Sequence, residues 1–158
     1  MITKTKVMLS AFVTVLAVLA GSVLAQAQTS EEHHKAITTH HAIAADHAKK
    51  IHTGESKTVA EHKTHATETG KSITEAKETH QKLKTSLTPE QQKATAVHHT
   101  TIEKHHADAT AHHKALSDEL AKTNPDETKA KEHAKNLHNS VQNAEKENQI
   151  LKTKTTKK

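Results

Sequence analysis

Apolar residues recur with a helical rhythm in two segments of the chain, near residues 34–51 and 99–120. Ile, Leu and Ala stand at alternating spacings of three and four, which places them along one face of an α-helix. Histidine shares this face at regular positions. The two stripes are His34, Ile37, His41, Ala44, Ala48 and Ile51, and His99, Ile102, His106, Ala109, His113, Leu116 and Leu120. Histidine therefore occupies positions where a helical bundle would ordinarily have leucine.

Glycine and proline divide the chain after residue 28 into four predicted helices. Thr53-Gly54 is typical of a helix end, with Gly at the C′ position. Thr88-Pro89-Glu90-Gln91 is typical of a helix start, because Thr88 can cap the helix and Gln91 can complete a capping box. Asn124-Pro125-Asp126-Glu127 and Ser30-Glu31-Glu32 predict two further starts. The predicted helices span about residues 31–52, 55–86, 89–122 and 125–151.

The predicted fold class is all-α. The connections are short, so successive helices should be antiparallel neighbours in an up-down-up-down four-helix bundle. Gly70 lies inside the second helix and is a place where that helix could kink or divide. From Gln28 onward, Val, Ile and Leu total only 15 of 131 residues. We therefore expect the bundle to be only marginally stable without a ligand.

The first 27 residues have the features of an export signal. Lys4 and Lys6 precede an apolar run over residues 7–24, and Ala25-Gln26-Ala27 places small residues where a signal peptidase cleaves. We expect residues 28–158 to form a mature His-rich bundle that is periplasmic or secreted, without stable membrane insertion. An uncleaved anchor is the alternative, because the run is nearly long enough to span a bilayer.

Composition excludes several classes of function. The chain has 158 residues, 17 of them His, with no Cys, Trp or Tyr. There is consequently no disulfide framework, no thiolate chemistry and no aromatic platform for nucleobases. All 23 basic residues are Lys and the net charge is +5 with neutral His, so nucleic acid is not an expected partner without Arg. No pair of acids and no Ser-His-Asp set stands out, and we do not expect an enzyme.

The histidines form a periodic array. Doublets recur every seven residues in residues 33–52 and again in residues 98–117, and the two segments agree at nine of 20 positions at an offset of 65. This agreement suggests a duplicated helical hairpin. Seven residues are two helical turns, so each doublet returns to nearly the same face about 10.5 Å further along. We therefore expect layers of imidazoles to which adjacent helices contribute.

Carboxylates complete some of these layers, because spacings of three, four and seven lie along one side of a helix. The groups are His99/Glu103/His106, His105/Asp108/His112 and Glu61/His62/His65. His52, His80 and His138 are the weakest candidates. The predicted metal ligands are His33, His34, His40, His41, His47, His62, His65, His98, His99, Glu103, His105, His106, Asp108, His112, His113 and His133.

Imidazole ligands indicate which metals to expect. They suit Cu(II), Ni(II) and Zn(II), whereas Ca(II) and Mg(II) prefer oxygen. Cu(I) has few suitable donors here, since Cys is absent and the two Met residues lie in the predicted signal. A flexible site of nitrogen and oxygen ligands binds Cu(II) most tightly. The sequence therefore predicts a buffer, scavenger or store that takes up several divalent transition-metal ions per chain, with Cu(II) favoured.

The chain resembles the small metal-binding protein (SmbP-type) family of nitrifying bacteria. The resemblance rests on the array and on His47-Ala48-Lys49-Lys50-Ile51-His52-Thr53-Gly54-Glu55 and Glu132-His133-Ala134-Lys135. It implies an exported helical bundle that binds several divalent ions, copper foremost, in a periplasm. The present chain is longer and richer in Thr, and it carries His-His doublets. The positions that fit best are His47, His52, His62, His65 and His133.

A second resemblance leads to a different class of function. Leu87-Thr88-Pro89-Glu90-Gln91 is similar to the LTxxQ motif of Spy/CpxP-type periplasmic stress chaperones. Helix capping explains the same five residues, there is no second copy, and an apolar cradle for clients is poorly supplied. A chaperone or stress sensor is therefore the alternative to metal binding.

Overall fold

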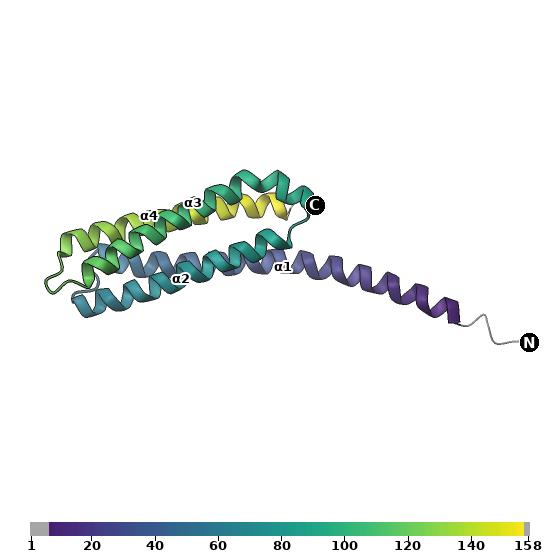
Figure 1. Ribbon diagram of the computed structural model, residues 1–158, viewed down its shortest axis with the longest axis horizontal. Coiled ribbons are helices and arrows are strands. Elements are labelled where there is room, and N and C mark those ends of the chain that lie inside the picture. Colours follow the sequence, from purple (N-terminus) through teal and green to yellow (C-terminus); the bar gives the residue numbers. More distant parts are fainter. Residues whose placement is uncertain (1–6, 157–158) are drawn as a thin grey trace, which may run out of the picture.

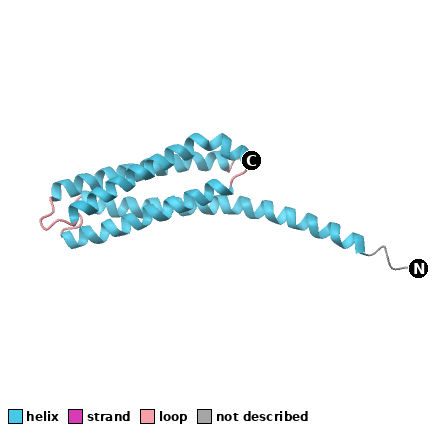
Figure 2. Cartoon of the chain, in the orientation of Figure 1, coloured by secondary structure: helices cyan, strands magenta, loops and turns pink. Residues whose placement is uncertain are grey.

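A computed structural model describes the backbone of residues 7–156 and the side chains of residues 30–156. All secondary structure in this range is helical, which confirms the all-α prediction (Figures 1 and 2). The four helices are α1 (Val7–His52), α2 (Val59–Ser86), α3 (Pro89–Leu120) and α4 (Glu127–Thr155).

The helices form a bundle in which α2, α3 and α4 lie alongside the second half of α1 (Figure 1). The connections 53–58 and 121–126 lie at one end of the bundle, and the connection 87–88 lies at the other (Figure 1). Within residues 30–156, whose side chains the structure describes, no helix has the length and apolar character required to cross a membrane.

The predicted start of the first helix, at about residue 31, was wrong. Ser30-Glu31-Glu32 does not begin a helix, because α1 starts at Val7 and continues through this segment, where Ser30 is buried. Extending an existing helix adds a hydrogen bond for each residue fixed, whereas a new start requires another nucleation step. A capping sequence within a continuing helix therefore stays helical. Residues 1–6 lie outside the described residues, and cleavage after residue 27 stays a prediction.

The other boundaries depend on local caps. Gly54 has φ +75°, the left-handed conformation expected at a C′ position. The helix α2 begins four residues later than predicted, because Thr58 caps it and forms a capping box with Glu61. Thr88 and Gln91 form the predicted box at the start of α3.

At the fourth helix the predicted start was two residues early. Asp126 is the N-cap, and its side chain accepts hydrogen bonds from the backbone N–H groups of Thr128 and Lys129. The helix α4 therefore begins at Glu127 instead of Pro125, and it extends to Thr155. The helix α3 ends at Leu120, two residues earlier than predicted.

The predicted stripes do face the interior. Every residue of both stripes is buried except His113, which is half-buried. The remaining interior positions come from α2 and α4. They are His62, Ala66, Thr69, Ser72, Ile73, Ala76, His80 and Leu83 in α2, and Ala130, Ala134, Leu137, Ser140, Val141, Ala144, Asn148 and Leu151 in α4.

The structure supports a duplicated hairpin. Each buried residue of α2 has a buried counterpart 68 positions later in α4, as Ile73 has in Val141. Buried residues of α1 correspond to buried residues of α3 at an offset of 65, as His41 does to His106, except that Ala48 corresponds to the half-buried His113. The α1/α4 and α2/α3 seams are therefore counterparts within the repeat.

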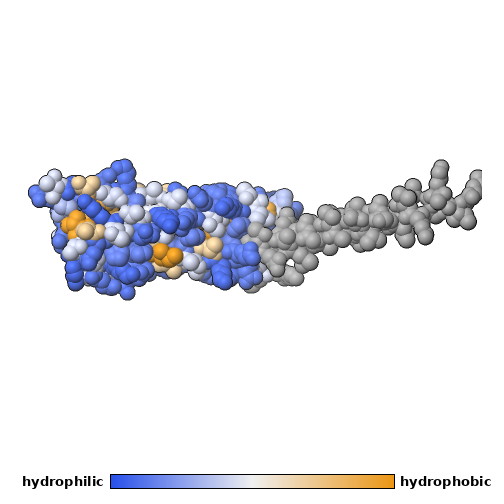
Figure 3. All heavy atoms as spheres, turned by 90° about the horizontal axis from the view of Figure 1, so that it is seen from below, coloured by the Kyte–Doolittle hydropathy of each residue, from blue (hydrophilic) through white to orange (hydrophobic). Residues whose placement is uncertain are grey.

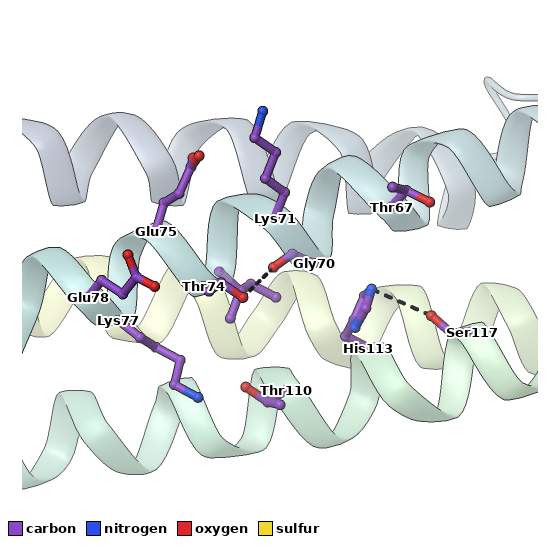
Figure 4. A pocket seen from close by; sticks show the side chains of 11 residues that line it. Thr67, Gly70, Lys71, Thr74, Glu75, Lys77, Glu78, Thr110, His113 and Ser117 are labelled. Atoms are coloured by element: carbon purple, nitrogen blue, oxygen red, sulfur yellow. Dashed lines mark hydrogen bonds between the residues drawn. The ribbon is translucent and has the colours of Figure 1, made fainter.

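These two seams differ in packing, because α2 and α3 contact one another less extensively than α1 and α4. In the first seam, His138 of α4 fills the space between the helices and donates a hydrogen bond from Nδ1 to the Ala45 carbonyl, 2.9 Å away. Its counterpart in α2 is Gly70. There His113 of α3 lies beside the glycine (Figure 4), and it donates a hydrogen bond from Nε2 to the Ala66 carbonyl, 2.9 Å away.

The α2/α3 seam is hollow along much of its length. Three cavities of about 280, 740 and 300 Å³ are lined by residues of these two helices. The largest lies beside Gly70 and His113 (Figure 4). The face of the bundle seen in Figure 3 is mainly hydrophilic, with a few separate apolar spots.

We predict that Gly70→Ala stabilises the fold only when His113 is also replaced by alanine. Alanine favours a helix by about 1 kcal/mol over glycine, but a Cβ at position 70 would lie 2.5 Å from the His113 ring. Displacing that ring costs its hydrogen bond, so the substitution should give no gain in the natural chain. In a His113→Ala background it should stabilise the fold by about 1 kcal/mol. Urea unfolding of the four chains of this double-mutant cycle measures the difference, and additive effects would contradict the packing described.

Candidate metal centre

Two histidines from opposite helices meet at the centre of the bundle. His41 of α1 and His106 of α3 lie with their Nε2 atoms 2.8 Å apart and their ring centroids 5.1 Å apart. They are counterparts in the repeated hairpin, so the contact joins the two halves of the chain at equivalent positions. Both side chains are buried. One imidazole must donate to the other across this contact.

Glu145 of α4 decides which ring donates. Its Oε2 atom is 2.7 Å from His41 Nδ1, and its Oε1 atom accepts from the Thr38 hydroxyl at 2.8 Å. Burial would raise the pKa of the Glu145 carboxyl, but hydrogen bonds from His41, Gln149 and Thr38 outweigh it and hold that pKa below its usual value. A neutral His41 therefore donates from Nδ1 to Glu145, and its Nε2 accepts from His106.

A second buried pair adjoins the first. His80 Nε2 of α2 lies 2.9 Å from His99 Nδ1 of α3, and the His80 ring also stands edge-on to His106 with centroids 5.8 Å apart. Four imidazoles from three helices thus form a continuous cluster, His41, His106, His80 and His99. The buried side of α2 supplies His80 at a spacing of four from Ala76.

The second pair is incompletely hydrogen-bonded. His80 Nδ1 and His99 Nε2 are both buried without a partner. Whichever ring donates in the shared hydrogen bond, the other ring is left with an N–H that reaches no acceptor, and one lone pair is also unused. A buried unsatisfied donor costs about 1–3 kcal/mol. These atoms are the kind of group that a ligand could satisfy.

Burial keeps these rings from taking up protons. It lowers the pKa of His80 to about 4, with a further contribution from His99, and lowers that of His99 to about 4, with Lys84 adding to the effect. Burial and the neighbouring His41 lower the pKa of His106 to about 3. A ring that titrates in this range is neutral at pH 7, which is the form that binds metal.

A third pair lies nearer the surface, between α1 and α2. His47 and His65 approach with their Nδ1 atoms 2.8 Å apart, and both side chains are half-buried. The pKa of His65 is lowered by burial and by His47. At the same end of the bundle, the rings of His52 and His138 stand 5.2 Å apart, and His52 Nε2 is buried without a partner.

Several other predicted ligands contact acidic or amide groups from neighbouring helices. His40 Nδ1 is 3.1 Å from Glu75 Oε2 without the alignment of a hydrogen bond. His98 is paired with Glu147. His34 is fully buried, and its two nitrogens lie 2.9 Å from Asn148 Oδ1 and 2.9 Å from Thr155 Oγ1.

The carboxylate groups predicted along single helices are not assembled. His99 and His106 face different partners, and Glu103 between them accepts hydrogen bonds from Lys84 and Gln81. Glu61 is a capping residue of α2. Within the described residues, no three His, Asp or Glu side chains stand ready around one point. Helical spacing places these residues on one side of a helix, but contacts with neighbouring helices determine the orientation of each side chain.

The remaining predicted ligands are spread along the bundle. His62 is buried, with Nε2 3.3 Å from the Ser56 carbonyl and Nδ1 without a partner. His113 is held beside Gly70 as described above. The half-buried residues with no hydrogen bond or ring contact to another side chain of residues 30–156 are His33, His105, Asp108, His112 and His133.

Sequence reasoning missed the central role of His80. Its neighbours along the chain carry no doublet, so it stood outside the array. The spacing Ile73, Ala76, His80 and Leu83 was the available signal, since it places His80 on the apolar face of α2. Comparison of the chain with family models, with curated protein sequences and with solved structures gives no match.

We predict that acid unfolds the metal-free protein over an unusual pH range. The unfolded chain takes up protons on His near pH 6.5, whereas folded His80, His99 and His106 do so only near pH 3–4. The contribution of these rings to the free energy of unfolding is therefore fully present above about pH 6.5. It falls as the pH drops toward 4, by about 1.4 kcal/mol per pH unit for each ring.

Thermal melts between pH 8 and pH 5 in the presence of a chelator test this dependence. His106→Leu is the comparison variant, since it removes one of the three rings and should make the pH dependence shallower. A melting temperature that is constant between pH 7.5 and 5 would contradict the burial of neutral imidazoles.

Proposed function

We propose that this chain binds several divalent transition-metal ions, with Cu(II) favoured and Ni(II) and Zn(II) also accepted, and that it buffers, scavenges or stores them. The observation that carries the proposal is the set of imidazole pairs formed between different helices. Three such pairs have nitrogens 2.8–2.9 Å apart. An exported, periplasmic or secreted location is proposed with it, on the signal-like first 27 residues.

The spacing within the pairs suits metals of tetragonal geometry. Nitrogens bound about 2.0–2.1 Å from one ion and at right angles to each other lie about 2.9 Å apart, whereas tetrahedral ligands lie about 3.4 Å apart. An ion could replace the shared proton by rotation of the rings, with little separation of the helices. The preference for Cu(II) over Zn(II) rests on the general order of affinity for nitrogen and oxygen ligands.

The chemical state of the pairs also supports the proposal. Buried His80, His99 and His106 have lowered pKa values, so that protons compete weakly for their nitrogens near pH 7. Unpartnered buried nitrogens on His52, His62, His80 and His99 would gain from a ligand. A carboxylate behind a ligand imidazole, as Glu145 stands behind His41, orients the ring and increases its basicity.

The arrangement favours capacity over a single tuned site. The pairs lie in two places, the central four-ring cluster and the His47/His65 pair, and each pair supplies only two nitrogens. Exchangeable ions completed by water or carboxylate oxygen are therefore expected. The repeat indicates one more site of the same kind. His112 and His133 are the counterparts of His47 and His65, at offsets of 65 and 68.

The chaperone alternative gains no support from the motif that suggested it. Thr88 Oγ1 accepts from the Gln91 N–H, and Gln91 Oε1 accepts from the Thr88 N–H, which closes the capping box at the start of α3. Thr88 and Gln91 of the LTxxQ-like segment are thus both engaged in starting a helix.

We predict that the chain binds more than two Cu(II) ions at pH 7.5 and that metal raises its melting temperature. Ligands that bind only the folded state stabilise it by mass action. Isothermal titration with Cu(II), followed by melts with and without chelator, measures both quantities. A stoichiometry of zero or one would contradict a storage or buffering function, and an unchanged melt would place the ions outside the folded core.

We also predict that counterpart pairs contribute equally to capacity. The double variant His47→Gln/His65→Gln and the double variant His112→Gln/His133→Gln should each lose about one bound ion, because each removes one two-nitrogen site. Thr64→Ser on the exposed side of α2 is the control and should keep full stoichiometry. Loss from only the first variant would show that the repeat is not reflected in binding.

A further inference from the structure

The hollow α2/α3 seam contains a pocket lined by metal-binding side chains. This cavity of about 300 Å³ is bordered by His80 of α2 and by His106 and Glu103 of α3. It is the smaller neighbour of the cavity beside Gly70 along the same two helices. The seam thus combines weak packing with a concentration of nitrogen and oxygen donors.

The hydrogen-bond network leaves both histidines of this pocket able to bind an ion. With Glu145 fixing His41, a neutral His106 donates from Nε2 to His41 and keeps a lone pair on Nδ1. His80 can likewise donate from Nε2 to His99, which leaves the buried, unpartnered His80 Nδ1 as a lone pair. Each ligand ring is then oriented by a second imidazole behind it.

The distance between the two rings is compatible with one shared ion. An ion about 2.0–2.1 Å from an imidazole nitrogen lies roughly 3.2 Å from the ring centre, so two ligand rings can be up to about 6.4 Å apart. The His80 and His106 centroids are 5.8 Å apart. Glu103 can supply an oxygen from the rim, since both of its hydrogen bonds, from Lys84 and Gln81, go to Oε1.

The counterpart seam is closed by protein groups alone. Between α1 and α4, His138 bonds to the Ala45 carbonyl, and Glu145 bonds to His41. At the positions equivalent to His138 and Glu145, α2 has Gly70 and Lys77. Gly70 brings no side chain, and Lys77, which also lines the pocket, offers no carboxylate to a histidine of α3 as Glu145 does to His41. The α2/α3 seam therefore lacks the contacts that close its counterpart.

We propose that one divalent transition-metal ion bound by His80, His106 and Glu103 holds α2 against α3, so that metal occupancy controls the packing of this seam alone. This inference rests on the proposed function and assigns it a structural consequence. The ion replaces the contacts that His138 and Glu145 provide between α1 and α4. His99 and His41 are positioning residues, which orient the two ligand rings.

Distance measurements between spin labels test the proposal on the full chain. Because the chain has no Cys, two introduced cysteines can be labelled without competing thiols. Lys82→Cys with Lys104→Cys spans α2 and α3 at exposed positions, and Ala42→Cys with Gln142→Cys spans α1 and α4 at exposed positions. Zn(II) is the probe, because it has a filled d shell and does not disturb the spin signal.

Zn(II) should narrow the distance distribution of the α2/α3 pair and leave that of the α1/α4 pair unchanged. In the α2/α3 background, His80→Gln and Glu103→Gln should abolish the narrowing and weaken binding of the first ion by about tenfold or more. Glu68→Gln, at an exposed position of α2 outside the pocket lining, is the matched control for Glu103→Gln and should retain the response. Glu103→Gln keeps an oxygen for Lys84, so it tests the site even if His80→Gln fails to fold, which circular dichroism would detect.

Three results would overturn the proposal. If Zn(II) binds and neither pair of labels responds, the ions occupy other sites, and the proposed function stands without this one. If both pairs respond equally, the metal stiffens the whole bundle and not one seam. If calorimetry finds that neither Zn(II) nor Cu(II) binds, both the proposed function and this inference fall.

Discussion

The contact between neutral imidazoles is the interaction on which this bundle depends. In a bundle of this size, the centre would ordinarily be filled by leucine and isoleucine. Here His41, His106, His80 and His99 fill that space and hydrogen-bond to one another across three helices. Each such contact needs a single hydrogen between its two nitrogens, and burial favours this state by lowering the pKa of His80, His99 and His106. Rings in this state keep lone pairs inside the fold. The side chains that pack the core are therefore also the ones that the proposed metal ions would bind.

The second constraint is the repeated hairpin, whose two copies carry different side chains at a few matched positions. Buried positions of one hairpin match those of the other throughout α2 and α4. Substitutions at matched positions give the two equivalent seams unlike properties. His138 and Glu145 fill and bind one seam, while Gly70 and Lys77 leave the other open. A duplicated hairpin has thus acquired one well-packed seam and one that contains cavities, and the donor-lined pocket lies in the second.

Polar networks at the helix ends complete the fold that the small apolar core begins. His34 joins Asn148 and Thr155, and capping boxes at Thr58 and Thr88 satisfy the first turns of α2 and α3. Three small apolar clusters are distributed along the bundle between the histidine layers. Alternating apolar and imidazole layers make stability sensitive to protons, and a core of leucine would lack that sensitivity.

The sequence by itself determined the helical class, the ends of α1 and α2, the start of α3 and the buried face of α1 and α3, because periodicity and capping are local properties of the chain. It also gave the repeat and the type of metal donor. Only the tertiary structure decided the partners: His80 entered the centre, Glu103 turned to Lys84, and α1 continued past Ser30. Helical spacing fixes which residues share a face, but the side chain that each one meets comes from a helix distant in sequence. The rotation and seam packing of the four helices set that choice.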